Sequence, residues 1–154
     1  MFVPYSELDA NARIWIYQSD RKLEAEEQED IASQLTDLCN NWNTHGDPLA
    51  CSFQLHDWFI CLFVDEQTFN ASGCSIDSSV AVIKSIAKQY SIDFFNRLNI
   101  AFWQDDTTKV LPLKDFKSAI RSDMVVYNNL VKTKAEYERF WKHPIKDSWL
   151  AKYL

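Results

Sequence analysis

Glycine and proline are scarce in this chain, with two Gly and four Pro among 154 residues. They are well spread, and no linker, repeat or low-complexity segment separates one part of the sequence from another. Hydrophobic residues make up 47% of the chain and aromatic residues 14%, a composition that excludes a disordered tail. We therefore expect one folded domain over residues 1–154, large enough to bury a core without a metal.

Long apolar runs are absent as well. The longest, Trp58–Val64, is far too short to cross a bilayer. The first residues lack a basic start, and the acidic Glu7 and Asp9 follow them closely. The sequence therefore predicts a soluble, cytoplasmic protein with no membrane partner.

Positive charge is in deficit, because 16 Lys and Arg residues stand against 22 Asp and Glu residues, for a net charge of -6. Nucleic acids are polyanions and repel such a chain outside any local basic patch. We predict no specific nucleic-acid partner.

The cysteines show no Cys-x-x-Cys spacing. In a chain without an export signal, a disulfide framework is not expected. We predict that three of the four are small hydrophobic residues of the core, namely Cys39, Cys51 and Cys61. Cys74 stands apart, because it lies in a polar loop.

Hydrophobic periodicity alternates between strand and helix along the chain. The expected strands are residues 12–18, 50–55, 58–64, 100–104 and 109–111, with a further apolar stretch at 124–127. The expected helices are residues 23–42, 76–90, 113–120 and 134–141. Thr133 and Glu136 have the spacing of a capping box for the last helix. The order predicts an α+β fold with a ferredoxin-like split βαβ core (β-α-β-β-α-β), an extra strand and C-terminal helices. A three-layer α/β fold with the same elements is the alternative.

A polar loop joins the strand at 58–64 to the second helix. Its candidate ligand-binding residues are Asp65, Glu66, Asn70, Ser72, Gly73, Ser75 and Asp77. With Ser75 as the expected N-cap, Cys74 would lie beside the helix N-terminus, where free N–H groups favour a thiolate or a bound anion. Gly73 would allow a sharp turn. The competing interpretation is an ordinary loop, in which the acidic side chains cap the helix or face solvent. Mg²⁺ binding by Asp65, Glu66 and Asp77 is a minor hypothesis. We predict no metal site.

A nucleophilic cysteine needs a base. His45, in Thr44-His45-Gly46-Asp47, is the best candidate, because a loop histidine here could approach the second helix. The alternative is a solvent-exposed loop histidine. His56 is expected to serve the turn between two strands.

Several segments carry a family resemblance. They are Phe2-Val3-Pro4-Tyr5, Ala12 to Gln18, His45-Gly46, Ala71-Ser72-Gly73-Cys74-Ser75-Ile76-Asp77-Ser78-Ser79, Asn128 to Val131 and Ser148-Trp149. Over essentially its whole length the chain looks like an uncharacterised bacterial family of about this length, often labelled "ABC transporter ATPase". The resemblance implies no established activity. The label itself fails, because no Gly-x-x-x-x-Gly-Lys-Ser/Thr loop is present to hold phosphates.

Two classes of function fit these residues. The first is an enzyme of thiol-dependent acyl or group transfer, with Cys74 as nucleophile and His45 as base; no cofactor can be named. The second is a non-catalytic binding module for a small anionic ligand or a protein partner, including a second copy of the chain. Its interface would use Trp15, Tyr17, Trp103 and Trp149. Stacking of RNA on Trp15 and Tyr17 is a weaker alternative, since Trp58–Val64 lacks the basic and glycine residues of an RNA motif.

Overall fold

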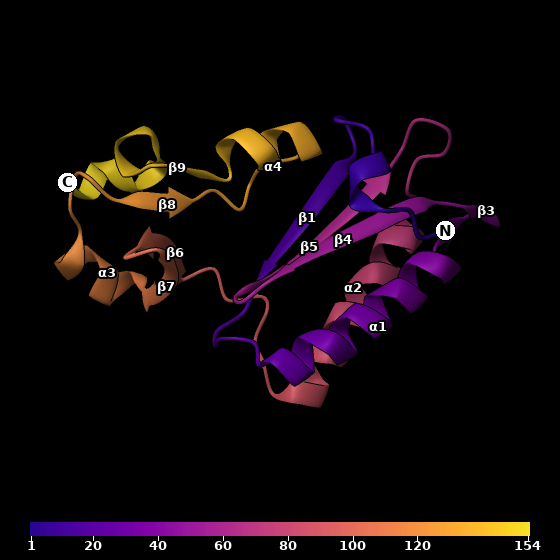
Figure 1. The fold of residues 1–154 in the computed structure, drawn as a ribbon, viewed down its shortest axis with the longest axis horizontal. Coiled ribbons are helices and arrows are strands. Elements are labelled where there is room, and N and C mark those ends of the chain that lie inside the picture. The colour runs from indigo at the N-terminus through magenta and orange to yellow at the C-terminus, as the bar shows by residue number, and fades with distance from the viewer.

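The computed structural model describes all residues, 1–154. The first half of the chain builds a three-stranded antiparallel sheet in the order β1-β5-β4. Its strands are β1 (Arg13–Gln18), β4 (Ala50–His56) and β5 (Phe59–Asp65). The helices α1 (Ala25–Asn41) and α2 (Gly73–Tyr90) lie together against one face of it (Figure 1). A small hairpin, β2 (Asn43–Thr44) and β3 (Asp47–Pro48), follows α1.

The second half builds a separate four-stranded sheet in the order β7-β6-β8-β9. Its strands are β6 (Asn99–Gln104), β7 (Thr107–Pro112), β8 (Val125–Tyr127) and β9 (Lys142–Pro144). The helices of this half are α3 (Leu113–Ala119) and α4 (Lys134–Phe140). Short 3₁₀ segments cover Tyr5–Glu7, Ile145–Asp147 and Trp149–Tyr153. Figure 1 shows β1 as the strand of the first sheet nearest to this second half.

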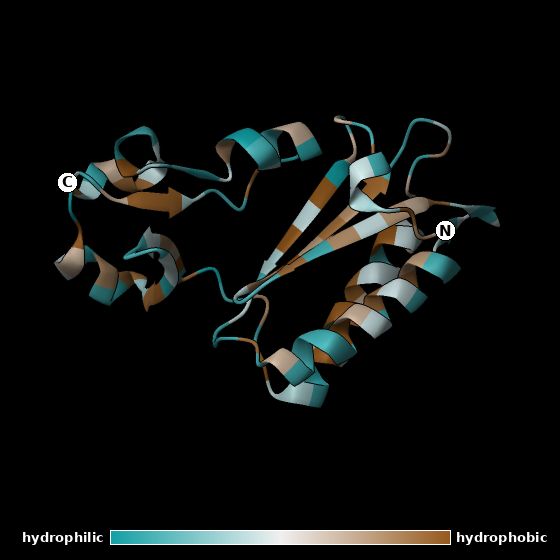
Figure 2. Cartoon of the chain, in the orientation of Figure 1, coloured by the Kyte–Doolittle hydropathy of each residue, from teal (hydrophilic) through white to brown (hydrophobic).

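The central strand β5 divides the core of the first half. Hydrophobic residues run along the strands of this sheet (Figure 2), and every residue of β5 from Phe59 to Val64 is buried. Because side chains alternate along a strand, Ile60, Leu62 and Val64 pack towards α1 and α2, while Phe59, Cys61 and Phe63 pack on the opposite face. Trp141, just after α4, joins the second set, and a third cluster fills the second sheet. The continuous apolar run thus reflects a strand covered on both faces.

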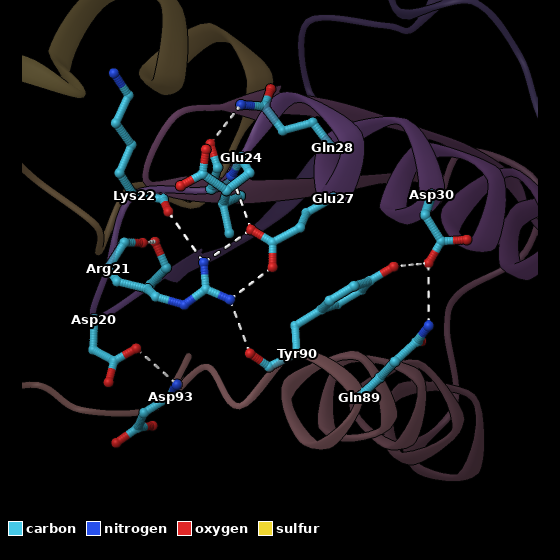
Figure 3. A network of polar contacts seen from close by, with 12 residues as sticks. Asp20, Arg21, Lys22, Glu24, Glu27, Gln28, Asp30, Gln89, Tyr90 and Asp93 are labelled. Carbon is cyan, nitrogen blue, oxygen red and sulfur yellow. Dashed lines mark hydrogen bonds and ion pairs between the residues drawn. The ribbon is translucent and has the colours of Figure 1, made fainter.

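A polar clamp fixes the ends of α1 and α2 (Figure 3). The Arg21 guanidinium forms two hydrogen bonds with the Glu27 carboxylate, at 2.8 and 2.6 Å, and a third with the backbone oxygen of Tyr90 at 2.8 Å. Tyr90 also donates its hydroxyl to Asp30. Glu24 and Glu27 form a capping box at the start of α1. One arginine therefore satisfies a carbonyl at the end of α2 and a carboxylate in the first turn of α1.

The α+β class is confirmed, and most expected helices and strands lie within a few residues of their predicted bounds. The ferredoxin-like order is not confirmed. Such a sheet would place a fourth strand, here β6, beside β1, but β6 pairs with β7 and β8 instead. Of the capping box predicted for α4, one half is present: Glu136 N donates to Thr133 Oγ1, whereas the Glu136 carboxylate accepts from Lys132 N. No helix has the length and apolar character needed to cross a membrane.

The prediction that the chain has no disulfide is wrong, because Cys39 and Cys51 form one. Both are buried as expected. The C-terminal part of α1 packs on β4, which brings the two Cα atoms to 5.3 Å. Sequence spacing could not show this contact between a helix and a strand.

Candidate functional site

A hollow of about 620 Å³ lies between α1, α2 and the β2–β3 hairpin, and we call it the α1–α2 groove. Four predicted site residues line it: His45, Ser72, Cys74 and Ser75. Its other lining residues are mostly polar and come from α1 and α2, including Gln34, Asp37, Asn41, Ser78 and Ser85. The structure therefore brings together residues that are nearly 30 positions apart in the sequence.

The start of α2 differs from the expected one. Ser72, not Ser75, is the N-cap, and its hydroxyl accepts a hydrogen bond from Ser75 N at 3.1 Å. Ser75 lies inside the first turn, where its hydroxyl donates to the Asn43 carbonyl at 2.6 Å. Trp42 Nε1 donates to the Ser75 carbonyl at 2.7 Å. The two serines thus attach α2 to the end of α1 and to β2, and both hydroxyls are already engaged.

Cys74 occupies the second position of α2, so it belongs to the first turn and does not precede the helix. Its side chain is exposed, its thiol is free, and its sulfur forms no hydrogen bond. The backbone N–H groups of Gly73 and Cys74 also have no partner within the protein. An exposed thiol and two free N–H donors therefore lie in the first turn, at the positive end of an 18-residue helix.

His45 lies at the tip of the β2–β3 hairpin, and His45 and Gly46 both have positive φ, 51° and 87°. These values fit a two-residue turn that needs left-handed backbone at both positions, which glycine adopts freely. The turn directs His45 into the groove lining, yet no hydrogen bond connects it to Cys74. Gly73, by contrast, has no positive φ, and a Cβ added there would meet nothing within 4 Å. The sharp turn expected at Gly73 is therefore not present.

The remaining predicted residues lie outside the groove. Asp65 accepts from Gln67 N at 2.9 Å, and Glu66 accepts from Ala71 N at 2.8 Å while pairing with Arg13 at 3.6 Å. Asn70 and Asp77 are exposed. No three His, Cys, Asp or Glu side chains gather as a metal would require. The acids of the loop shape the loop itself.

A second histidine lies in a buried aromatic cluster on the far face of the first sheet. His56, at the end of β4, contacts Tyr137 through Nε2 and the hydroxyl at 2.6 Å, and its ring lies 4.8 Å from that of Trp141. Burial lowers the pKa of His56 and raises the pKa of the Cys61 thiol. Cys61 is fully buried, and His56 is half-buried with its Nε2 engaged by Tyr137, so both are poor candidates for chemistry.

Sequence reasoning missed a larger hollow of about 1100 Å³ between the two halves, which we call the β1 cleft. Its walls are mainly β1, residues 94–97, residues 99–101, residues 127–133 and Trp149. In the sequence, the only signal for this cleft was that Trp15 and Tyr17 follow Arg13 at alternate positions of one strand. The cleft itself depends on the position of the second sheet. Comparisons with family models, curated proteins and solved structures found no match for this chain.

Proposed function

We propose that the α1–α2 groove is a site of thiol-dependent group transfer, with Cys74 as the acceptor of an acyl group. One observation carries the proposal: Cys74, with its exposed free thiol and its unpaired N–H group, lines the same hollow as His45, and the unpaired N–H group of Gly73 precedes it in the first turn. A nucleophile, anion donors and a base are the three parts that acyl transfer needs.

In the proposed step, the Cys74 sulfur attacks the carbonyl carbon of an ester or thioester, so that a carbon–sulfur bond forms. The bond from that carbon to the leaving oxygen or sulfur breaks, and the leaving group takes the proton that Cys74 gave up. His45 carries this proton from the thiol to the leaving group. The N–H groups of Gly73 and Cys74 stabilise the negative charge on the carbonyl oxygen.

A second function fits the same groove, namely non-catalytic binding of a small anion by these N–H groups. One observation favours it: no hydrogen bond joins the Cys74 sulfur to His45, so a thiolate–imidazolium pair is not preformed. In this case the unpaired N–H groups of Gly73 and Cys74 hold the ligand without a covalent bond.

The experiment separates the two functions by following covalent modification. Purified protein is incubated with p-nitrophenyl acetate, and peptide mapping locates the acetyl group over a series of pH values. We expect fast acetylation of Cys74, no acetylation in Cys74→Ser, and a slower rate in His45→Ala at neutral pH. His143→Ala is the matched control, because this histidine lies in β9, far from the groove lining.

Of two possible results, the first would decide against group transfer and the second against His45 as its base. If Cys74 reacts no faster than a free cysteine peptide, the groove does not activate the thiol. If the rate is high but unchanged in His45→Ala, the first-turn N–H groups act without the proposed base. If the thiol is not activated, anion binding that persists in Cys74→Ser would identify the second function.

A further inference from the structure

The outer edge of β1 is a strand edge with unpaired backbone groups. On its inner side β1 pairs with β5 along its whole length, from Arg13 to Gln18. On its outer side only the first residues are covered: Ile14 N donates to the Lys132 carbonyl at 3.2 Å, and Lys134 N donates to the Ala12 carbonyl at 2.8 Å. No hydrogen-bonded strand lies beyond them.

The pairing stops abruptly after Ile14. Lys132 N, which would return a bond to the Ile14 carbonyl, donates instead to the Glu136 carboxylate at 2.7 Å. Backbone groups on one edge of a strand belong to alternate residues, so the free edge carries the Ile14 carbonyl, both groups of Ile16 and the N–H of Gln18. None of these groups has a hydrogen bond to another segment. They provide one place where a further strand could add.

The β1 cleft lies along this edge, since all six residues of β1 line it. The opposite wall carries side-chain amides, Asn96, Asn99, Asn128 and Asn129. At one end Gln18 spans the cleft, because its Nε2 donates to the Asn99 carbonyl at 3.0 Å and its Oε1 accepts from Asn129 at 2.9 Å. A free strand edge facing apolar surface and amide groups suits an extended main chain, which presents both donors and acceptors.

The charge of the cleft is opposite to that of the whole chain. Its charged residues are Arg13, Arg97, Lys132 and Glu66, a surplus of two positive charges in a protein of net charge -6. Glu66 is paired with Arg13, whereas Arg97 and Lys132 are exposed and form no ion pair. The cleft therefore attracts negatively charged side chains.

We propose that the β1 cleft binds an extended, acidic peptide segment of a partner protein, which adds a strand to the free edge of β1. Main-chain hydrogen bonds to Ile14, Ile16 and Gln18 hold the segment, and Arg97 and Lys132 select its acidic side chains. This site shares no residue with the α1–α2 groove, so it is independent of the function proposed there.

The probe is a fluorescein-labelled synthetic peptide of about eight residues, Glu-Val-Glu-Val-Thr-Val-Glu-Val, long enough to cover the open edge at about 3.3 Å per residue. Two control peptides accompany it. One has Lys in place of every Glu, and the other keeps all side chains but is N-methylated at every amide. We expect binding of the acidic peptide, at least about tenfold weaker binding of the lysine peptide, and none of the methylated peptide.

Protein variants locate the binding on β1. Arg97→Glu should weaken binding at least about fivefold, while Arg139→Glu, the same charge change outside the cleft, should change it less than about twofold. Ile16→Pro removes the central N–H of the free edge and leaves the bonds to β5 intact, as proline is tolerated on such edges. Amide hydrogen exchange on wild-type protein gives a readout that needs no variant: bound peptide should protect the N–H groups of Ile16 and Gln18.

Three outcomes would overturn the proposal. The first is no binding of the acidic peptide up to about 1 mM. The second is equal binding of the methylated peptide, which would mean that only side chains are recognised. The third is binding that leaves the amides of Ile16 and Gln18 unprotected, as expected for a small-anion site at Arg97 and Lys132 alone.

Discussion

The two hollows of this molecule differ in how much of their polar lining is already used. In the α1–α2 groove the hydroxyls of Ser72 and Ser75 are bonded within the protein, while the first-turn N–H groups and the Cys74 thiol have no partner. The β1 cleft leaves a strand edge without partners and two cations without ion pairs. The polar groups of the loop before α2 therefore bond mainly within the protein, while the hydrophobic strand β1 has more backbone groups without a partner.

The difference follows from the position of the second sheet. Strand β6 pairs with β7 and β8 and not with β1. The aromatic cluster around Phe59 and Trp141 packs the second half against the face of the first sheet opposite α1 and α2. The space that a fourth strand would fill thus remains open as a cleft.

The largest expected effect comes from removing that support. Phe59 is fully buried and contacts Trp141, Tyr127 and His56, so Phe59→Ala should lower the free energy of unfolding by about 3–5 kcal/mol. Urea denaturation measures the change. Phe140→Ala is the control, because this ring is 56% exposed and its loss should cost less than about 0.5 kcal/mol. Equal effects of the two substitutions would mean that the cluster does not hold the halves together.

The two glycines offer a matched test of the groove. Gly46→Ala should cost about 1 kcal/mol or more, because alanine is strained at a φ of 87°. Gly73→Ala should be neutral or stabilising by up to about 1 kcal/mol, because its Cβ meets nothing and alanine favours a helix. Thermal unfolding of both variants checks the order. A reversed order would place the strained turn at Gly73 and not beside His45.

A smaller effect is expected from the clamp in Figure 3. The hydrogen bonds from Arg21 lower the pKa of Glu27 from 4.5 to about 2. A carboxylate with a depressed folded-state pKa stabilises the fold above its unfolded pKa, and this stabilisation is lost as the pH falls from about 4.5 towards 2. Because the ion pair is partly exposed, the effect should be below about 1 kcal/mol. Glu27→Gln should reduce the pH dependence of stability over that range, and an unchanged profile would contradict the clamp.

The smallest expected effect is none at all. If the groove and the cleft are separate sites, saturation with the acidic peptide should leave the rate of Cys74 alkylation by iodoacetamide unchanged. Alkylated protein should in turn bind the peptide as before. A change of more than about twofold in either direction would show that the two hollows are coupled.

Local patterns were sufficient for the first half of the fold. The apolar run of β5 and the hydrophobic stripe of α1 depend on neighbouring residues alone, and the structure has both. The N-cap of α2 was misplaced by three positions, because Ser72 and Ser75 are equally good caps and only the contact with Asn43 distinguishes them. The pairing of Cys39 with Cys51 also depends on packing.

The separation of the two sheets could not be predicted from sequence. Whether β6 pairs with β1 or with β8 depends on contacts between distant segments, and β8 and β9 are only three residues each. The gathering of His45 and Cys74 was anticipated because both lie at the same end of the first sheet. The β1 cleft was not anticipated, because it exists only since no strand pairs with the outer edge of β1.

Hydrogen exchange on the free protein tests the open edge of β1 most directly. The N–H groups of Trp15 and Tyr17 face β5, while that of Ile16 faces the cleft, so their exchange rates should alternate along the strand. We expect the Ile16 amide to exchange at least about tenfold faster than those of Trp15 and Tyr17. Equal, strong protection of all three amides would show that another segment covers this edge, and the proposed peptide site would then not exist.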